Sequence, residues 1–267
     1  MPAANLAQES IQEEANKCLP RYNGRTIDET RQKMLNGSLL GKGLYSISEA
    51  ARILQMRADT VRRWVTGYSF GRNGHKRYSP PLIQLSTIDG VSEVFLTFQN
   101  LIELLFIRLF HREGVSLYTI RAAALEAQAD FNSRHPFAVK QFDTDGKGIF
   151  ATLEFKDIEG ITKSKVLKDL RLSQMVIDEI ARPYFKNLEY SDLGVIRYYP
   201  LGTDKGIVLD PKRSFGKPID EASGVATYVL YQMARAGEAP RDIAAWYGVS
   251  EEAVSNAIEY EVLLKAA

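Results

Sequence analysis

The stretch Ile47-Ser-Glu-Ala-Ala-Arg-Ile-Leu-Gln-Met-Arg-Ala-Asp-Thr-Val-Arg-Arg-Trp64 has the pattern of two short helices joined by a tight turn. The helices of a helix-turn-helix unit cross closely, so a small residue is required at their contact, and Ala51 occupies that position. Leu54 and Met56 bracket the turn, and Val61 and Trp64 supply the inner face of the second helix. We therefore predict a helix-turn-helix unit over this stretch.

Two positions depart from the usual pattern of such a unit. Gln55 stands where the turn often has glycine, so its backbone has to tolerate the angles of the turn. Arg57 stands where a Ser or Thr cap is common. Asp59 lies in the first turn of the second helix, where a negative charge favours the helix dipole. The outward side of this helix then carries Arg57, Thr60, Arg62 and Arg63.

The segment around this unit is basic, although the whole chain has a net charge of only +1. Seven Lys or Arg and two acidic residues lie between Ser46 and Pro81, which gives +5 over this segment. Gly71-Arg-Asn-Gly-His-Lys-Arg-Tyr78 follows the second helix, and its Asn73-Gly74 pair is a tight-turn signal. We predict a basic hairpin, or wing, beside the recognition helix.

A basic wing next to a recognition helix indicates DNA binding, because cations hold the phosphate backbone while the helix reads base edges in the major groove. The alternative is an ordinary charged face in water. The basic charge, the helix-turn-helix spacing and the predicted wing occur in the same segment, so we favour DNA binding. The predicted DNA-binding residues are Arg52, Arg57, Thr60, Arg62, Arg63, Arg72, His75, Lys76, Arg77 and Tyr78.

A second copy of the template runs from Pro240 to Ala257, with Ala244 at the small position and Gly248 at the turn. Ser250, followed by two glutamates, is a good helix start. Eight acidic and three basic residues lie between Asp220 and Ala267, a net charge of −5. Phosphate would repel this copy. We expect it to bind a protein partner or a second copy of the chain through Glu251, Glu252, Ser255, Asn256 and Glu259; weak DNA contact by Arg235 and Arg241 is the alternative.

The remaining pattern predicts a mainly α fold with a small β component, an α+β protein. Helices are expected from Glu93 to Arg112 and from Ser116 to Phe131, and a third from Leu172 to Phe185. Strands are expected at Phe137–Phe142, Ile149–Phe155, Val195–Tyr199 and Gly206–Leu209, with a turn-rich linker at Pro211–Pro218. The predicted segments are an N-terminal arm (1–43), a winged helix-turn-helix domain with a helical extension (44–136), a small α+β middle segment (137–205) and a C-terminal helix-turn-helix domain (206–267).

Composition excludes several kinds of site. A single cysteine, Cys18, rules out an intramolecular disulfide and a Cys-based zinc site, and three histidines make a multi-His metal centre improbable. The apolar run Val91–Phe110 is interrupted by three charged residues, so it fails as a membrane span, and no signal peptide is visible. We expect no membrane association and a cytoplasmic location.

No constellation predicts an enzyme or a bound cofactor. Asp143 to Glu154 has calcium-loop spacing, but Lys147 stands where an oxygen ligand belongs, so a hairpin turn is the better interpretation. Acidic residues are scattered rather than paired, which leaves a metal-dependent nuclease as a residual alternative. The expectation is that the chain is not an enzyme and holds no cofactor.

Three stretches of the basic segment resemble a MerR-type winged helix-turn-helix: Tyr45-Ser-Ile-Ser-Glu-Ala-Ala51, Arg62-Arg-Trp64 and His75-Lys-Arg-Tyr-Ser79. The helices within 101–131 and the exit His135-Pro-Phe-Ala138 resemble the DNA-binding half of VapB-type antitoxins with that head. The C-terminal segment resembles an uncharacterised domain family that occurs alone or as the tail of such antitoxins. The motifs of that segment are Gly206-Ile-Val-Leu-Asp-Pro211, Gly216-Lys-Pro-Ile-Asp220, Gly237-Glu-Ala-Pro240 and Ile258-Glu-Tyr-Glu261.

This resemblance implies a type II antitoxin that neutralises a PIN-domain ribonuclease toxin and regulates its own transcription. The apolar stripe from Phe95 to Leu109 predicts core, and a homodimer that uses part of it would match a palindromic operator in double-stranded DNA. Two alternatives stay open. One is a MerR-type regulator with a small-ligand pocket in 137–205, and the other is an adaptor that binds only proteins.

Overall fold

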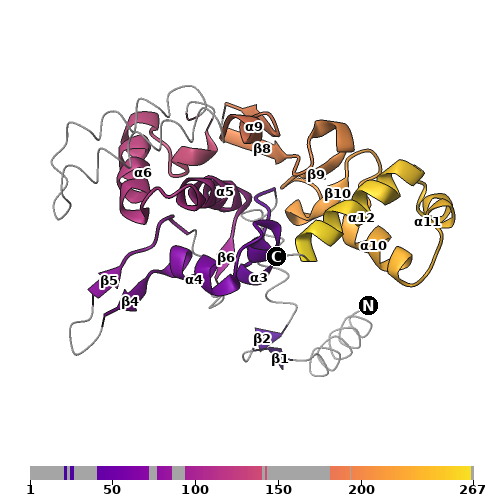
Figure 1. The fold of residues 1–267 in the computed structure, drawn as a ribbon, viewed down its shortest axis with the longest axis horizontal. Helices are drawn as coiled ribbons and strands as arrows, with labels where there is room; N and C mark the ends of the chain where they lie inside the picture. The colour runs from indigo at the N-terminus through magenta and orange to yellow at the C-terminus, as the bar shows by residue number, and fades with distance from the viewer. Residues whose placement is uncertain are drawn as a thin grey trace, which may run out of the picture. The chain divides into compact units, whose positions relative to one another are not determined.

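The computed structural model describes residues 21–22, 25–26, 41–71, 77–85, 94–139, 142, 181–192 and 194–265. Contacts divide the chain into two units, residues 1–40 and 41–267. In the first unit, strands β1 (Arg21–Tyr22) and β2 (Arg25–Thr26) pair antiparallel. The second unit contains both helix-turn-helix sequences (Figure 1).

The N-terminal part of the second unit, which we call the head, runs from β3 to η1. Its elements are β3 (Tyr45–Ser46), α3 (Ile47–Ile53), α4 (Ala58–Thr66), β4 (Tyr68–Phe70), β5 (Arg77–Ser79), β6 (Phe95–Leu96), α5 (Phe98–Arg112), α6 (Leu117–Phe131) and the 3-10 helix η1 (Pro136–Ala138). Helix α3 begins with a capping box, in which the Glu49 amide donates to Ser46 Oγ at 3.2 Å and the Ser46 amide donates to Glu49 Oε2 at 2.9 Å. Ala51, Val61 and Trp64 are buried, which confirms the predicted helix-turn-helix.

Helix α5 forms the centre of the head, and its apolar residues are buried on all sides, as expected for core. It begins at Phe98 rather than at the predicted Glu93, because β6 pairs with β3 and Thr97 caps the helix with Asn100. Helix α6 starts at the Ser116 cap, as predicted, with the Thr119 amide donating to Ser116 Oγ at 3.1 Å.

The predicted strand Phe137–Phe142 is wrong in its described part, since residues 136–138 form η1. Phe137 and Phe142 pack together with ring centroids 4.8 Å apart, and both contact Phe110 of α5. Aromatic burial against α5 therefore determines this segment rather than strand pairing. The predicted strand Ile149–Phe155 and its turn lie outside the described residues, as does most of the predicted helix Leu172–Phe185, whose last turn is α9 (Arg182–Phe185).

A four-stranded antiparallel sheet follows, in the order β10-β9-β8-β7. Its strands are β7 (Leu188–Ser191), β8 (Gly194–Tyr198), β9 (Ile207–Leu209) and β10 (Pro218–Asp220). Strands β8 and β9 confirm two predicted strands, whereas β10 lies at the end of the segment predicted as linker. The predicted segment boundary at residues 205–206 falls between β8 and β9, which pair at Tyr198 and Leu209.

The C-terminal part, which we call the tail, runs from β9 to the end of α12. Its helical elements are the 3-10 helix η4 (Ser214–Gly216), α10 (Thr227–Arg235), α11 (Pro240–Tyr247) and α12 (Glu251–Lys265), and the 3-10 helix η3 (Thr203–Lys205) precedes β9. Leu230, Ile243, Val254 and Leu264 form the centre of its own small core. The fold is thus mainly α with a small β component, which confirms the predicted class.

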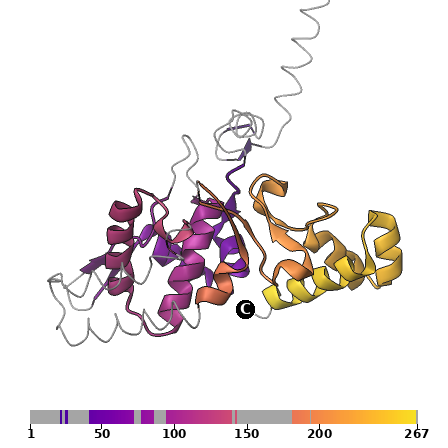
Figure 2. The ribbon, with the colours of Figure 1, turned by 90° about the horizontal axis from the view of Figure 1, so that it is seen from above.

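Head and tail contact each other within the second unit. Directly before β3, the Leu44 amide donates to the Phe215 carbonyl at 3.1 Å, and the buried Tyr45 hydroxyl of the head donates to the Gly216 carbonyl at 2.7 Å. The C-terminal end of α12 lies beside α3 in both ribbon views (Figures 1 and 2), and Gln55 Nε2 donates to the Leu263 carbonyl at 3.5 Å. Among the helices that the structure describes, none is both long and apolar enough to cross a lipid bilayer.

Candidate nucleic-acid interface

Helix α4 carries a basic outer face. Arg57, Arg62 and Arg63 are exposed and Thr60 is half-buried, while Val61 and Trp64 turn inward. Trp64 packs edge-on against His111 of α5, with ring centroids 5.6 Å apart, and its carbonyl accepts from the Leu82 amide at 2.8 Å. The buried side thus fixes α4 on the head and leaves four polar side chains on its outer face, of which Arg63 lies over the Tyr68 ring at 5.6 Å from the centroid.

The turn that precedes α4 has the strain expected from its sequence. Gln55 has φ of 51°, in the left-handed region that favours glycine. Arg57 is the N-cap of α4 and makes no side-chain cap hydrogen bond. Arg108 of α5 stabilises the start of this turn, because its Nη1 donates to the carbonyl of Leu54, the C-cap of α3.

The wing is present as a two-stranded hairpin, in which β4 pairs antiparallel with β5 and Phe70 is opposite Arg77. Arg77 and Tyr78 are exposed. The predicted contacts Arg72, His75 and Lys76 lie outside the described residues. The structure therefore brings the recognition helix and the two described wing residues into one part of the head.

A tight joint holds the wing next to α4. The Tyr78 hydroxyl donates to the Thr66 carbonyl at 3.3 Å. Gly67, with φ of 74°, connects α4 to β4, and a Cβ there would collide with the Tyr78 hydroxyl and lie 2.8 Å from the Ser79 carbonyl oxygen. Only glycine fits this joint, so Gly67 sets the angle between helix and wing.

Arg121 of α6 supports the base of the wing and was not found from the sequence. Its Nη2 donates to the Pro80 carbonyl at 2.9 Å and to Ser79 Oγ at 3.3 Å. Burial lowers the pKa of Arg121, and the nearby Tyr68 opposes this shift. The residue is 42 positions from Ser79 in sequence, so no local pattern indicates the contact.

The structure places Arg52 apart from the other predicted DNA contacts. Arg52 belongs to α3, and its Nη1 lies 3.5 Å from Oε2 of Glu261 on α12. This cation therefore faces the tail, and its location does not match the DNA-binding role predicted from its charge.

The second helix-turn-helix unit is formed by α11 and α12. Gly248 caps α11 in the left-handed conformation, with φ of 64°, and the Ala253 amide donates to Ser250 Oγ at 3.0 Å, as the sequence predicted. Glu251, Glu252, Ser255 and Glu259 are exposed on α12. These four residues define what we call the acidic face.

Asn256 does not share the acidic face. It is 6% exposed, and its Nδ2 donates to the Lys205 carbonyl at 3.1 Å. Lys205 Nζ in turn lies 3.3 Å from Glu259 Oε2. Asn256 thus connects α12 to η3, which corrects its predicted place on a partner-binding surface.

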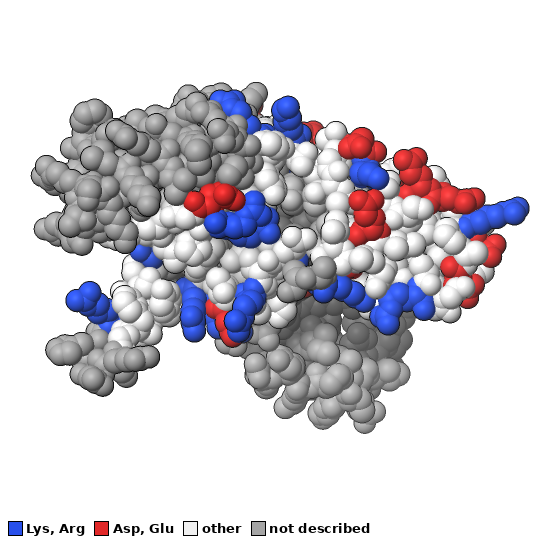
Figure 3. Space-filling view, viewed as in Figure 1, with Lys and Arg blue, Asp and Glu red and all other residues white. Residues whose placement is uncertain are grey.

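The surfaces of the head and the tail differ in charge. In Figure 3 most of the visible acidic side chains lie over the tail, on the right, while Lys and Arg side chains are spread along the lower edge of the head. Within the described ranges, no group of three or more His, Cys, Asp or Glu side chains could hold a metal ion. The predicted hairpin turn with calcium-loop spacing, Asp143 to Glu154, lies outside them.

Two family models match the chain. Residues 43–124 match a family described as "Putative DNA-binding HTH domain", and residues 207–260 match a family described as "Protein of unknown function (DUF433)". The first match covers the helix-turn-helix, the wing and the start of α6. The second covers most of the tail.

Two curated proteins of Mycobacterium tuberculosis (strain ATCC 25618 / H37Rv) are similar over most of their length. One is named "Putative antitoxin VapB45" and is 28% identical over 222 residues, which are 81% of this chain and 92% of the relative. The other is named "Uncharacterized protein Rv2308" and is 27% identical over 241 residues, 86% of this chain and 94% of the relative.

A solved structure has the same fold. The X-ray crystal structure of Rv2018 from Mycobacterium tuberculosis superposes with a TM-score of 0.62, covering 80% of this chain and 96% of that one at 22% sequence identity. Head and tail thus occur together in other proteins, and the head of this chain is a helix-turn-helix domain of a kind described as DNA-binding.

Proposed function

We propose that the protein is an antitoxin that binds operator DNA through its head and a toxin through its tail. The observation that carries the DNA part is the outer face of α4, where Arg57, Arg62 and Arg63 are exposed together beside the wing. Arginine is suited to this place because its fork of donors pairs with guanine edges and phosphates. The wing would hold the phosphate backbone through Arg77 and through the predicted contacts Arg72, His75 and Lys76.

The winged head is proposed to bind in the manner of MerR-type proteins, as a homodimer on a palindromic operator. A two-fold protein matches the symmetry of such a site, since each recognition helix then enters one major-groove half-site. Binding to its own promoter would regulate transcription of its gene, in the cytoplasm of the cell.

The acidic face of the tail is the proposed docking surface for the toxin. A ribonuclease such as a PIN-domain protein has to attract RNA, so its active groove is expected to be basic. The exposed carboxylates of Glu251, Glu252 and Glu259 complement such a groove and would keep RNA out of it. The similarity to a protein named as an antitoxin supports this part of the proposal. The proposed function assigns no catalytic step to this chain.

DNA binding is tested with the fragment upstream of the protein's own gene, by fluorescence anisotropy over a range of salt. The double variant Arg62→Ala/Arg63→Ala is compared with Arg134→Ala, an exposed arginine in the loop after α6. We expect the double variant to lose on the order of a hundredfold in affinity, since each base contact contributes about 1–3 kcal/mol. Equal affinity of both variants would exclude α4 as the recognition helix.

Toxin binding is tested by expressing the protein together with the neighbouring reading frame and purifying the complex. The double variant Glu251→Gln/Glu252→Gln removes two charges from the acidic face without changing side-chain shape, and Asp130→Asn on α6 is the matched control. We expect weaker retention of a small ribonuclease by the first variant only. A complex that neither variant weakens would place the toxin elsewhere on the chain.

A further inference from the structure

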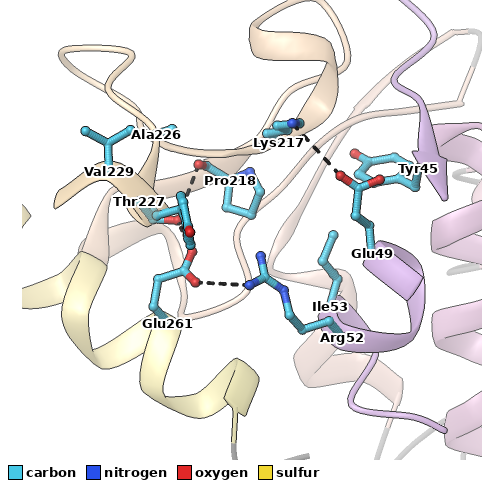
Figure 4. A pocket seen from close by; sticks show the side chains of 11 residues that line it. Tyr45, Glu49, Arg52, Ile53, Lys217, Pro218, Ala226, Thr227, Val229 and Glu261 are labelled. Carbon is cyan, nitrogen blue, oxygen red and sulfur yellow. Dashed lines mark hydrogen bonds and ion pairs between the residues drawn. The ribbon is translucent and has the colours of Figure 1, made fainter. Parts of the chain in front are cut away.

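A cavity of about 350 Å³ lies between the head and the tail, and neither part of the proposed function uses it (Figure 4). Helix α3 provides one wall, while β10, α10 and α12 provide the other. Ile53, Pro218 and Val229 give the cavity an apolar lining. Small-molecule sites are typically of about this volume, mostly apolar, and equipped with a few polar groups that orient the ligand.

Four charged side chains line the cavity as two ion pairs. The head supplies the cation of one pair and the anion of the other. Arg52 of the head faces Glu261 of the tail, and Lys217 of the tail faces Glu49 of the head (Figure 4). The nitrogen–oxygen distances are 3.5 Å and 3.9 Å. Charge-assisted hydrogen bonds are normally about 2.7–2.9 Å long, so both ion pairs are longer than such hydrogen bonds.

Glu261 has an oxygen with no hydrogen bond, although the residue is fully buried. Its Oε1 accepts from the Thr227 hydroxyl at 2.6 Å, whereas Oε2 accepts from no group in the part of the chain that the structure describes. A buried carboxylate oxygen without a donor is costly, because burial removes the water that would otherwise solvate it. A donor placed in the cavity would satisfy it.

Arg52 offers the complementary group. Its guanidinium carries five N–H donors. In the described ranges, only Glu261 lies within ion-pair distance of it. On the opposite side, Glu49 uses Oε2 for the α3 capping box and turns Oε1 towards Lys217. The cavity thus presents unused donors and unused acceptors close together.

We propose that this cavity binds a small zwitterion with an apolar side chain, of the amino-acid class. Its carboxylate would pair with Arg52, and its ammonium group would donate to Glu261 Oε2 and Glu49 Oε1. The apolar body would fill the space against Ile53 and Val229. Two acidic and two basic side chains balance in the lining, so a neutral zwitterion leaves no charge uncompensated, whereas a simple anion or cation would.

Binding is measured on the full chain without DNA or toxin, so its failure is separate from failure of the proposed function. Each of the twenty L-amino acids is titrated and followed by calorimetry and by saturation-transfer NMR. We expect at least one apolar amino acid to bind with Kd of about 1 mM or tighter. For the best amino acid, the carboxylic acid lacking the amino group and the amine lacking the carboxylate serve as probes, and both are expected to bind about tenfold more weakly or worse.

Three variants connect the binding to the cavity. Arg52→Met removes the carboxylate partner and keeps an apolar stem, and Val229→Trp fills the space while leaving all four charges in place. Both are expected to weaken binding by about tenfold or more, while Arg134→Met in the loop after α6 leaves Kd unchanged. Val229 is partly exposed, so its variant is expected to fold, which thermal unfolding checks. The proposal is overturned if no amino acid binds, if the acid alone binds as tightly, or if Val229→Trp has no effect.

Discussion

The two helix-turn-helix units of this chain share a template but use their second helices differently. In the head, α4 is nine residues long, packs its inner side on α5 and leaves an arginine-rich face exposed. In the tail, α12 is fifteen residues long, its exposed acidic face ends at Glu259, and its C-terminal end contacts the α3 segment through Glu261 and Leu263. The tail unit is closer to the ideal template in its turn and cap, yet it is the one whose second helix is engaged by the rest of the molecule.

The comparison teaches that the quality of a motif and its role are separate questions. Gly248 and Ser250 make a low-energy turn and cap, whereas Gln55 and Arg57 provide neither. Charge and exposure, rather than the fit of the turn, distinguish the head as the unit suited to a polyanion.

The largest expected effect concerns DNA affinity. Replacing Arg62, Arg63 and Arg77 by alanine in the head should weaken binding to operator DNA by a hundredfold or more, since base contacts contribute about 1–3 kcal/mol each. Replacing Arg235 and Arg241 in the tail should change it by less than about twofold. Titrations at several salt concentrations measure both. A large loss in the tail variant would break the comparison, because it would mean that the second unit also contacts DNA.

A smaller effect is expected for the wing support, which the tail lacks. Arg121→Met keeps the apolar stem and removes the hydrogen bonds to Ser79 and Pro80. We expect DNA affinity to fall by about three- to tenfold, because these hydrogen bonds support the wing without contacting DNA, so only part of their roughly 1.5 kcal/mol each affects binding. Anisotropy measures the affinity, and near-unchanged thermal unfolding would show that the fold is retained. Full affinity in this variant would mean that the wing needs no support from α6.

The ion pair between Arg52 of the head and Glu261 of the tail should affect stability rather than DNA binding. Arg52→Met leaves the buried Glu261 without its cation, and we expect a loss of about 1–3 kcal/mol, less than for a fully buried pair because Arg52 is partly exposed. The double variant Arg52→Met/Glu261→Met should recover most of this loss. Urea unfolding of the two single variants and the double variant gives the coupling energy. A coupling near zero would show that α12 is held to the head by its other contacts.

The smallest effect tests the two turns directly. Gln55→Gly should raise the free energy of unfolding by about 1 kcal/mol, and Gly248→Ala should lower it by about the same amount, because both positions are left-handed. A Cβ on Gly248 meets nothing within 4 Å in the described part of the chain, so the second change isolates backbone strain. Opposite signs in urea unfolding would sharpen the comparison. Equal signs would show that the lost contact from Gln55 to Leu263 outweighs the relief of strain.

Local patterns in the sequence predicted much of this fold. The small residue at Ala51, the caps at Ser116 and Ser250 and the turn at Gly248 act within a few residues, so they are readable without the structure. The strain at Gln55 was predicted for the same reason. The wing strands and the exposed arginines of α4 also follow from the pattern.

What the sequence could not provide are pairings between distant segments. Strand β10 is three residues long, begins with proline and is defined by its pairing with β9. Arg52 looked like a DNA contact because its partner, Glu261, is 209 residues away. Asn256 looked exposed because its burial depends on η3. In each case a residue's role is decided by a neighbour that no local window contains.

Helix α12 connects the acidic face of the tail to the head. The ten residue steps from Glu251 to Glu261 span about 15 Å, so one continuous helix carries both the acidic face and the contact with α3. A protein bound to the acidic face would therefore lie on the same helix that contacts α3, the helix before the recognition helix.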